Sequence, residues 1–117
     1  NRFQVGDRVA ALLPLFGSRW GTAAEYVNIP YSFAAKIPDS VDFISAAAVP
    51  LVGLTTLRAF EYVSHKNKQA GNKILIQAGG GGVGTFAIQY AKNVLGMNVT
   101  TTVSSSKKKQ QALRNLG

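Results

Sequence analysis

The sequence predicts an α/β fold that contains the first two strands of a parallel sheet. Residues 73–78 form a short, continuous apolar run, which is typical of a strand covered on both faces. A glycine cluster at 79–82 interrupts this run, a helical pattern follows, and residues 98–103 form a second strand rich in β-branched side chains. The order strand, glycine loop, helix, strand, helix predicts a βαβα unit with a right-handed crossover.

The two helices of this unit are predicted from apolar spacing and from residues typical of helix ends. The first helix carries one apolar stripe at helical intervals, and Gly96 stands where a C-terminal glycine is expected. The stripe comprises Val83, Phe86, Ala87, Tyr90, Ala91, Val94 and Leu95. Ser104 to Ser106 can cap a final helix over residues 107–116.

The preceding part of the chain predicts short strands followed by two helices. A turn at residues 5–8 leads into an apolar run that Pro14 closes, and residues 23–29 resemble a strand that ends at Pro30. Ser45 can cap a short helix over 46–49. Pro50 suits the first position of a second helix, which would reach about Val63.

Composition and charge exclude several classes of protein. The 117 residues carry a net charge of +8 and contain no cysteine, which excludes disulfides and thiolate metal sites. No apolar run approaches the roughly 20 residues that cross a bilayer, so we expect no membrane span. Every charged residue after Glu61 is basic, which favours an anionic partner. No recognition-helix or stacking-aromatic pattern supports nucleic acid as that partner.

The glycine loop predicts a dinucleotide site. Gly79, Gly81 and Gly84 satisfy G-x-G-x-x-G between an apolar strand and a helix. One glycine is expected to make the turn with a φ that disfavours a Cβ, another to let the backbone touch a diphosphate, and a third to let the helix pack closely. The amides around residues 82–85 would then face the anion. A tight turn without a ligand is the alternative, and some of the four consecutive glycines would cost stability without need.

The residues after the second strand favour NADP over NAD. An NAD site of this kind expects Asp or Glu about 20 residues beyond the glycines, where it binds the ribose hydroxyls. Residues 101–106 contain only Thr, Val and Ser, and Lys107 and Lys108 follow. Hydroxyl and ammonium groups can hold a 2′-phosphate that a carboxylate would repel.

Four motifs in order resemble the zinc-independent quinone oxidoreductase branch of the medium-chain dehydrogenase/reductases. They are Val5-Gly6-Asp7-Arg8-Val9, Gly21-Thr22-Ala23-Ala24-Glu25-Tyr26-Val27, residues 46–56, and Ala78-Gly79-Gly80-Gly81-Gly82-Val83-Gly84 with the helix after it. The last of these matches the branch's A-x-x-G-x-x-G fingerprint. The resemblance implies the C-terminal part of a GroES-like barrel domain over residues 1–48. A linker helix and the first βαβα part of an NADP-binding Rossmann domain would follow over 49–117.

The resemblance also implies which residues bind the cofactor and what they do. Thr55 would lie near the nicotinamide. The 2′-phosphate would be bound by Ser104, Ser105, Lys107 or Lys108. The diphosphate would be held by the loop residues Ala78, Gly79, Gly81, Gly82, Val83 and Gly84. The expected activity is hydride transfer from NADPH to a quinone or an activated α,β-unsaturated carbonyl. Phe16, Trp20 and Phe33 could line a quinone cleft, although aromatic residues in a barrel more often belong to the core.

Zinc-dependent relatives resemble the chain less. Leu51 stands where a third catalytic zinc ligand would be expected, and a lone His65 in a polar connector is more often a surface residue. We therefore expect no metal site.

The resemblance leaves the substrate and the biological setting open. Two alternatives remain, an enoyl-thioester reductase on the same scaffold and a non-catalytic nucleotide-binding protein with a regulatory or interaction role. Because a dinucleotide fold needs more strands, we expect a fragment that is inactive by itself. We expect a homodimer in the full-length protein and a cytoplasmic location, with an organelle such as the mitochondrion as the alternative.

Overall fold

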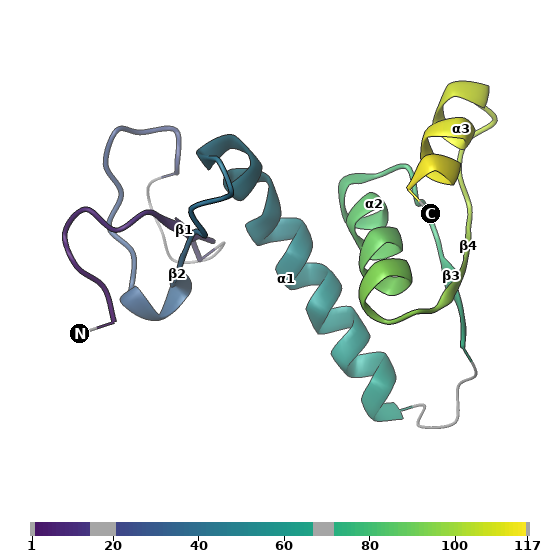
Figure 1. Cartoon of the computed structure of the whole chain (residues 1–117), viewed down its shortest axis with the longest axis horizontal. Coiled ribbons are helices and arrows are strands. Elements are labelled where there is room, and N and C mark those ends of the chain that lie inside the picture. The colour runs from purple at the N-terminus through teal and green to yellow at the C-terminus, as the bar shows by residue number, and fades with distance from the viewer. Residues whose placement is uncertain (1, 15–20, 67–71, 117) are drawn as a thin grey trace. The chain divides into compact units, whose positions relative to one another are not determined.

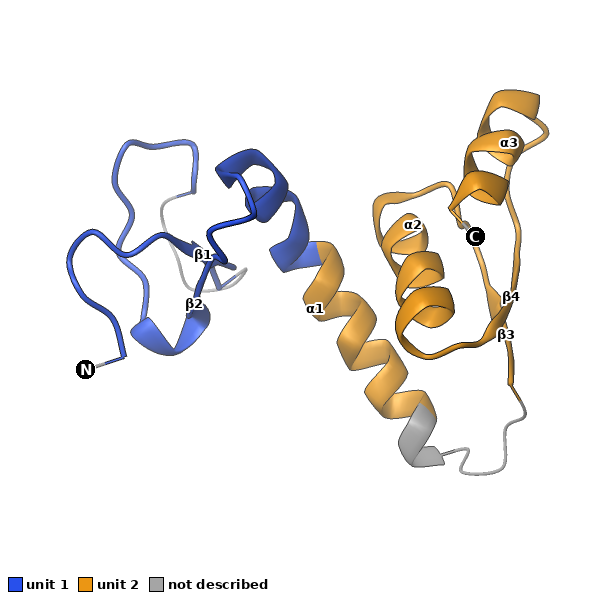
Figure 2. Ribbon diagram, in the orientation of Figure 1, with its two compact units in different colours: residues 1–51 blue, residues 52–117 orange. Residues whose placement is uncertain are grey.

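The computed structural model describes residues 2–14, 21–66 and 72–116, and for 64–66 it describes the backbone alone. The chain divides into two compact units, residues 1–51 and residues 52–117 (Figure 2). The division falls inside the long helix α1, Phe43–Lys66. The assignment of these units to a barrel domain and a Rossmann domain stays a prediction.

The first unit contains a small antiparallel strand pair. Strand β1, Val9–Ala11, pairs with β2, Ala34–Lys36, so that Val9 lies opposite Lys36. A 3-10 helix, η1 (Tyr31–Phe33), leads directly into β2. The turn before β1 requires Gly6, whose φ of +95° disfavours any other residue.

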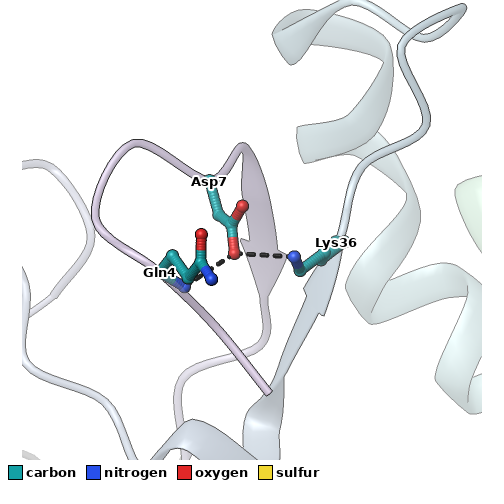
Figure 3. A network of polar contacts seen from close by, with 3 residues as sticks. All are labelled: Gln4, Asp7 and Lys36. Carbon is teal, nitrogen blue, oxygen red and sulfur yellow. Dashed lines mark hydrogen bonds and ion pairs between the residues drawn. The ribbon is translucent and has the colours of Figure 1, made fainter. Parts of the chain in front are cut away.

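A polar contact joins that turn to β2. The Asp7 carboxylate lies 2.8 Å from the Lys36 ammonium and accepts a hydrogen bond of 2.8 Å from the Gln4 amide (Figure 3). The hydrogen bond from Lys36, followed by the one from Gln4, lowers the pKa of Asp7 below its usual value. The turn and both strands are thereby connected through one side chain.

Arg8 links the start of β1 to the segment that precedes α1. Its guanidinium donates to the Val41 carbonyl at 2.6 Å and to the Pro38 carbonyl at 3.3 Å, and it stacks 4.6 Å from the centre of the Phe43 ring. The Arg8 carbonyl accepts the Ile37 amide at 2.9 Å. These contacts satisfy backbone carbonyls of a segment that has no regular structure of its own.

The predicted strand over residues 23–29 is wrong. Residues 21–30 form no strand, and Tyr26 is 91% exposed. Strand propensity is expressed only when a neighbouring strand supplies backbone partners and a packed face. Among the described residues, this segment has neither.

Helix α1 is one continuous helix, so the predicted break at Pro50 is also wrong. Pro50 lies inside the helix, and the cap is Asp42 rather than Ser45. The Asp42 carboxylate accepts the Ser45 amide at 2.8 Å and the Ser45 hydroxyl at 2.7 Å. An Asp that accepts the third amide of a helix is a favoured N-cap, and this cap allows the helix to begin before the proline.

The continuity of α1 changes what its composition implies about membranes. Over Phe43–Val63 the helix has a mean hydropathy of 1.6, long and apolar enough to cross a bilayer. This length differs from the expectation of no membrane span, which went with a helix that begins at Pro50. Core helices of water-soluble proteins have the same length and composition, and α1 carries an Arg58–Glu61 ion pair at 3.1 Å. Length and hydropathy are therefore weak evidence for a span.

The second unit contains the predicted βαβα arrangement. Strand β3, Lys73–Ile76, lies parallel to β4, Asn98–Thr101, with Ile74 opposite Val99. Between them the chain forms α2, Gly82–Gln89, which continues as a short π-helix, η2 (Tyr90–Val94). Helix α3, Lys107–Asn115, follows β4 (Figure 1). This part of the fold prediction is confirmed.

Helix α2 and η2 bury only part of the predicted apolar stripe. Ala87 and Ala91 of the stripe are buried, whereas Val83, Val94 and Leu95 are exposed. Ile88, which the stripe did not include, is buried as well, and burial of such a side chain contributes about 1.5–3 kcal/mol. The Tyr90 ring meets the Phe60 ring of α1 edge to face at 5.4 Å. The π-helix ends at Val94 with Leu95 as its C-cap, and Gly96 follows with a φ of +64°, which confirms the expected C-terminal glycine.

Candidate functional site: the glycine loop and the start of α3

The glycine loop lies at the carboxyl edge of the parallel sheet. It follows the last residue of β3, and the segment after β4 ends at the same edge because the two strands are parallel. In open α/β sheets, ligands bind outside the carboxyl ends of the strands. The site therefore combines the loop over 77–81 with residues 102–109.

Thr102 fixes the start of the loop with two hydrogen bonds. Its hydroxyl oxygen accepts the Ala78 amide at 2.9 Å, and its carbonyl accepts the Gly79 amide at 2.9 Å. The Ala78 carbonyl in turn accepts the Gly81 amide at 3.0 Å. Three amides of the predicted site, those of Ala78, Gly79 and Gly81, thus already donate hydrogen bonds to Thr102 or within the loop.

The sharp turn is made by Ala78 and not by a glycine. Ala78 has a φ of +56°, whereas no glycine between 79 and 84 has a positive φ. The left-handed conformation costs a residue with a Cβ about 1 kcal/mol. The Thr102 hydroxyl helps to hold Ala78 in it. The expectation that a glycine serves this purpose is wrong, since the partner that makes an alanine acceptable lies 24 residues along the chain.

Close packing explains two of the glycines. A Cβ on Gly84 would lie 2.5 Å from the Ala78 carbonyl oxygen and 2.7 Å from the Gly79 Cα, so helix α2 approaches the loop only with glycine there. A Cβ on Gly79 would collide with the Thr101 hydroxyl, which donates to the Ile76 carbonyl at 2.6 Å. Gly79 is therefore required by its neighbour on β4 and is not a superfluous glycine.

The amides of Gly80, Gly82 and Val83 form a group, here called the cradle, that is open to an anion. Gly80, Gly82 and Val83 are exposed, and within the described chain their amides donate no hydrogen bond. Added Cβ atoms at Gly80 and Gly82 would meet nothing closer than 3.4 Å. The amide of Thr85 donates to the Gly81 carbonyl at 2.9 Å, so it is not available. Free amides at the start of a helix suit a diphosphate, and the cradle fits this part of a dinucleotide.

The second part of the site is the start of α3. Ser104, Ser105, Lys107 and Lys108 are all exposed there. Ser106 occupies the N-cap position, but its side chain makes no capping hydrogen bond. The structure therefore presents hydroxyl and ammonium groups after β4, where the sequence analysis expects the 2′-phosphate.

Sequence reasoning missed two residues, Gly80 and Lys109. The Lys109 Cδ lies 3.9 Å from the position of a Cβ on Gly80, so its side chain lies beside the glycine loop. Lysine 109 is one of three consecutive lysines, and only the structure distinguishes it from the other two. Gly80 falls at a variable position of the fingerprint, which gives no signal of its own.

Helix α1 lies beside the glycine loop at Gly82. The Val52 Cγ1 lies 3.4 Å from the position of a Cβ on Gly82. Thr55 lies one turn further along the same helix and is exposed. Its neighbour Thr56 is 1% exposed, with no partner for its hydroxyl among the described residues. The structure thus brings α1 to the cradle but does not test the nicotinamide role of Thr55.

The structure leaves most of the remaining predicted positions undescribed. Phe16 and Trp20 lie outside the described residues, and the side chain of His65 is also outside them. Phe33, in η1, is 51% exposed. Among the described residues, no three His, Asp or Glu side chains gather as metal ligands would. Two surface grooves, of about 480 and 410 Å³, have no loop glycine among their lining residues.

Comparison with known proteins links this arrangement to oxidoreductases. The chain is 42% identical over 115 residues to a quinone oxidoreductase of Pseudomonas aeruginosa, covering 96% of the chain and 32% of that protein. It is 40% identical to the highly reducing polyketide synthase anuA of Penicillium roqueforti, covering 98% of the chain and 5% of the synthase. Its fold matches the crystal structure of a Pseudomonas syringae pv. Tomato DC3000 quinone oxidoreductase with a TM-score of 0.72 and 35% identity, over 100% of the chain and 34% of that structure. No protein-family model matches the chain.

These likenesses identify the fold and the proteins to which the chain is related. The fold, with its parallel strand pair and glycine loop, is that of the medium-chain dehydrogenase/reductases. Within that class, the chain is a homologue of the quinone oxidoreductases and spans about a third of their length.

Proposed function

We propose that the protein is an oxidoreductase that transfers hydride from NADPH to a quinone or an activated α,β-unsaturated carbonyl. The observation that carries this proposal is the cradle of free amides at Gly80, Gly82 and Val83, beside a helix start that carries three lysines. The likeness to quinone oxidoreductases supports the reaction class. In this proposal the bound nicotinamide supplies the hydride, and this chain's residues bind and orient the dinucleotide.

The preference for NADPH rests on charge at the end of β4. After Thr101 the chain offers hydroxyls and then lysines, and no carboxylate follows Glu61 anywhere in the sequence. The ribose of NAD would therefore lack the acidic partner that it usually has, while a 2′-phosphate would find Lys107 and Lys108. A favourable charge contact of about 1–4 kcal/mol corresponds to a preference of roughly tenfold or more.

We also propose that this stretch contributes no zinc ligand and that the hydride step proceeds without metal. The sequence contains no cysteine and a single histidine, the two residue types that most often bind zinc beside carboxylates. Leu51, at the position expected for a ligand, has no atom that can coordinate zinc. Activity that survives exhaustive chelation in the full-length protein would agree with this part of the proposal.

The test is a titration followed by turnover. We expect full-length protein to bind NADPH at least about tenfold more tightly than NADH, and K107Q/K108Q to abolish most of that difference. Because the double variant keeps the glycine loop, its affinity for NADH is expected to be unchanged. Equal affinity of the native protein for both dinucleotides would contradict the preference.

A second candidate is an enoyl-thioester reductase. Highly reducing polyketide synthases resemble the chain at 35–40% identity, for example 38% over 108 residues in the xilA synthase of Penicillium crustosum. An α,β-unsaturated thioester is chemically close to an enone, since hydride adds to the same conjugated position. Parallel assays with a quinone, an enone and an enoyl thioester separate the two candidates by their kcat/KM values.

A further inference from the structure

Thr102 is hydrogen-bonded to three positions of the segment that leads from β3 into the glycine loop. It directly follows the last residue of β4, and its amide donates to the Ile76 carbonyl at 3.3 Å. Its hydroxyl oxygen accepts the Ala78 amide at 2.9 Å, and its carbonyl accepts the Gly79 amide at 2.9 Å. The residue after β4 therefore determines how the chain leaves β3.

The geometry of the loop depends on Ala78. Its φ of +56° lies in the left-handed region, which is unfavourable for a residue with a Cβ. The Ala78 carbonyl accepts the Gly81 amide at 3.0 Å, and its oxygen lies 2.5 Å from the position of a Cβ on Gly84, at the start of α2. This one peptide group thus sets both the turn of the loop and the approach of α2, and the amides of the cradle belong to the same turn.

The neighbouring threonines do not share this contact. In the described chain, the Thr101 hydroxyl donates to the Ile76 carbonyl at 2.6 Å, a group of β3 itself. Thr100 is an exposed residue of β4. Among threonines 100–102, the Thr102 hydroxyl alone accepts an amide of the loop, as far as the structure describes the chain.

We propose that Thr102 is a positioning residue for the dinucleotide, whose hydroxyl holds Ala78 in the left-handed conformation so that the cradle is formed before the ligand binds. This inference rests on the proposed function. Thr102 acts through Ala78 and is assigned no contact with the dinucleotide. A site that is already in its binding geometry loses less conformational freedom on binding, which raises affinity. Because NADPH and NADH share the diphosphate, Thr102 strengthens the binding of both by the same factor.

The first test compares T102V, T102S and T100V in the full-length protein. Dissociation constants for NADPH and NADH are measured by titration, and thermal unfolding verifies that each variant is folded. T102V removes the hydroxyl at nearly constant volume, so we expect both dinucleotides to bind about fivefold more weakly, the value of one hydrogen bond. T102S keeps the hydroxyl and is expected to stay within about twofold of the native affinities. T100V is the matched control and leaves both constants unchanged.

The second test asks whether the effect passes through Ala78. Glycine adopts the left-handed conformation without the penalty of a Cβ. We therefore expect A78G/T102V to bind both dinucleotides about two- to threefold more tightly than T102V. A loss of affinity caused by general destabilisation of β4 is not repaired by a glycine at position 78.

The third test needs no variant, so it applies even if T102V does not fold. Amide hydrogen exchange is measured in the native full-length protein without a dinucleotide. The Ala78 amide has the Thr102 hydroxyl as its acceptor, whereas the Gly80 amide donates to no group of the described chain. We expect the Ala78 amide to exchange much more slowly than the Gly80 amide.

Each test has an outcome that overturns the proposal. Unchanged affinities in folded T102V, or a loss for NADPH alone, mean that Thr102 does not position the diphosphate site. Equal affinities of T102V and A78G/T102V mean that the effect does not pass through Ala78, and fast exchange of the Ala78 amide means that the loop is not held in advance. All of these leave the proposed function standing. A native protein that binds neither dinucleotide overturns the proposed function and this inference with it, so the two kinds of failure are distinguishable.

Discussion

At the scale of single residues, the glycines of the loop serve different purposes. Gly84 permits close contact between α2 and the Ala78 carbonyl, and Gly79 makes room for Thr101, while a Cβ on Gly80 would make only ordinary van der Waals contacts. The fingerprint G-x-G-x-x-G predicts that a tight loop is present. It does not predict that Ala78 makes the turn, or that Gly79 is needed to avoid a clash with Thr101. Those contacts depend on residues more than 20 positions away.

The contrast between Gly84 and Gly80 yields a prediction at this scale. G84A forces a Cβ against backbone atoms that cannot move cheaply, so we expect the free energy of unfolding to fall by about 2 kcal/mol or more. G80A places its Cβ in ordinary van der Waals contact, so stability is expected to change by less than about 0.5 kcal/mol. Because that Cβ would stand in the cradle, dinucleotide affinity falls about tenfold in G80A. Denaturant unfolding measures the stability of both variants, and titration measures their affinity for NADPH. Equal losses of stability in G84A and G80A would contradict the claim that Gly84 serves packing while Gly80 serves binding.

At the scale of elements, local sequence signals misplaced the start of α1 and predicted a strand over 23–29 that does not form. Proline commonly begins a helix, so the sequence favoured a start at Pro50. The Asp42 cap begins the helix at Phe43, seven residues before that proline. The segment over 23–29 shows the converse, since strand-like composition alone gave no strand. In both cases a contact beyond the local pattern decided the outcome.

Replacing the proline tests the continuity of α1. P50A restores an amide within the helix and removes the ring's clash with the preceding turn, so we expect the free energy of unfolding to rise by about 1–3 kcal/mol. Chemical denaturation, with helix content followed by far-UV circular dichroism, provides the measurement. P38A, which lies before the helix, serves as the control and is expected to cause no gain. A loss of stability in P50A would show that the proline is required for the helix as it stands.

The Asp42 cap predicts a dependence of stability on pH. Hydrogen bonds from the Ser45 amide and then the Ser45 hydroxyl lower the pKa of Asp42 below its ordinary value. A lowered pKa in the folded state means that the ionised carboxylate stabilises the fold above its ordinary pKa. That contribution is lost as the pH falls through the lowered value. We expect native protein to melt at a higher temperature than D42A at pH 7, and the difference to shrink below about pH 4. A difference that stays constant with pH would exclude the charge as its cause.

At the scale of the whole molecule, the sequence predicted the order of elements better than their surroundings. The strand, glycine loop, helix, strand order of the second unit is confirmed, because hydrophobic periodicity and glycine position are local signals. The apolar side chains exposed along α1 could not be foreseen, among them Phe43, Ile44, Leu51, Leu54 and Leu57. Periodicity indicates which residues are apolar but does not identify the surface that covers them.

The central claim is that a diphosphate binds the free amides of the glycine loop, and amide hydrogen exchange tests it most directly. Exchange is measured residue by residue in the full-length protein, with and without saturating NADPH. The amides of Gly80, Gly82 and Val83 have no acceptor in the described chain, so we expect their hydrogens to exchange fast in the free protein. When NADPH is bound, we expect the exchange of these three amides to become markedly slower. The amides of β1 and β2 should not change. If NADPH binds and the three loop amides keep their fast exchange, the diphosphate lies elsewhere and the account is wrong.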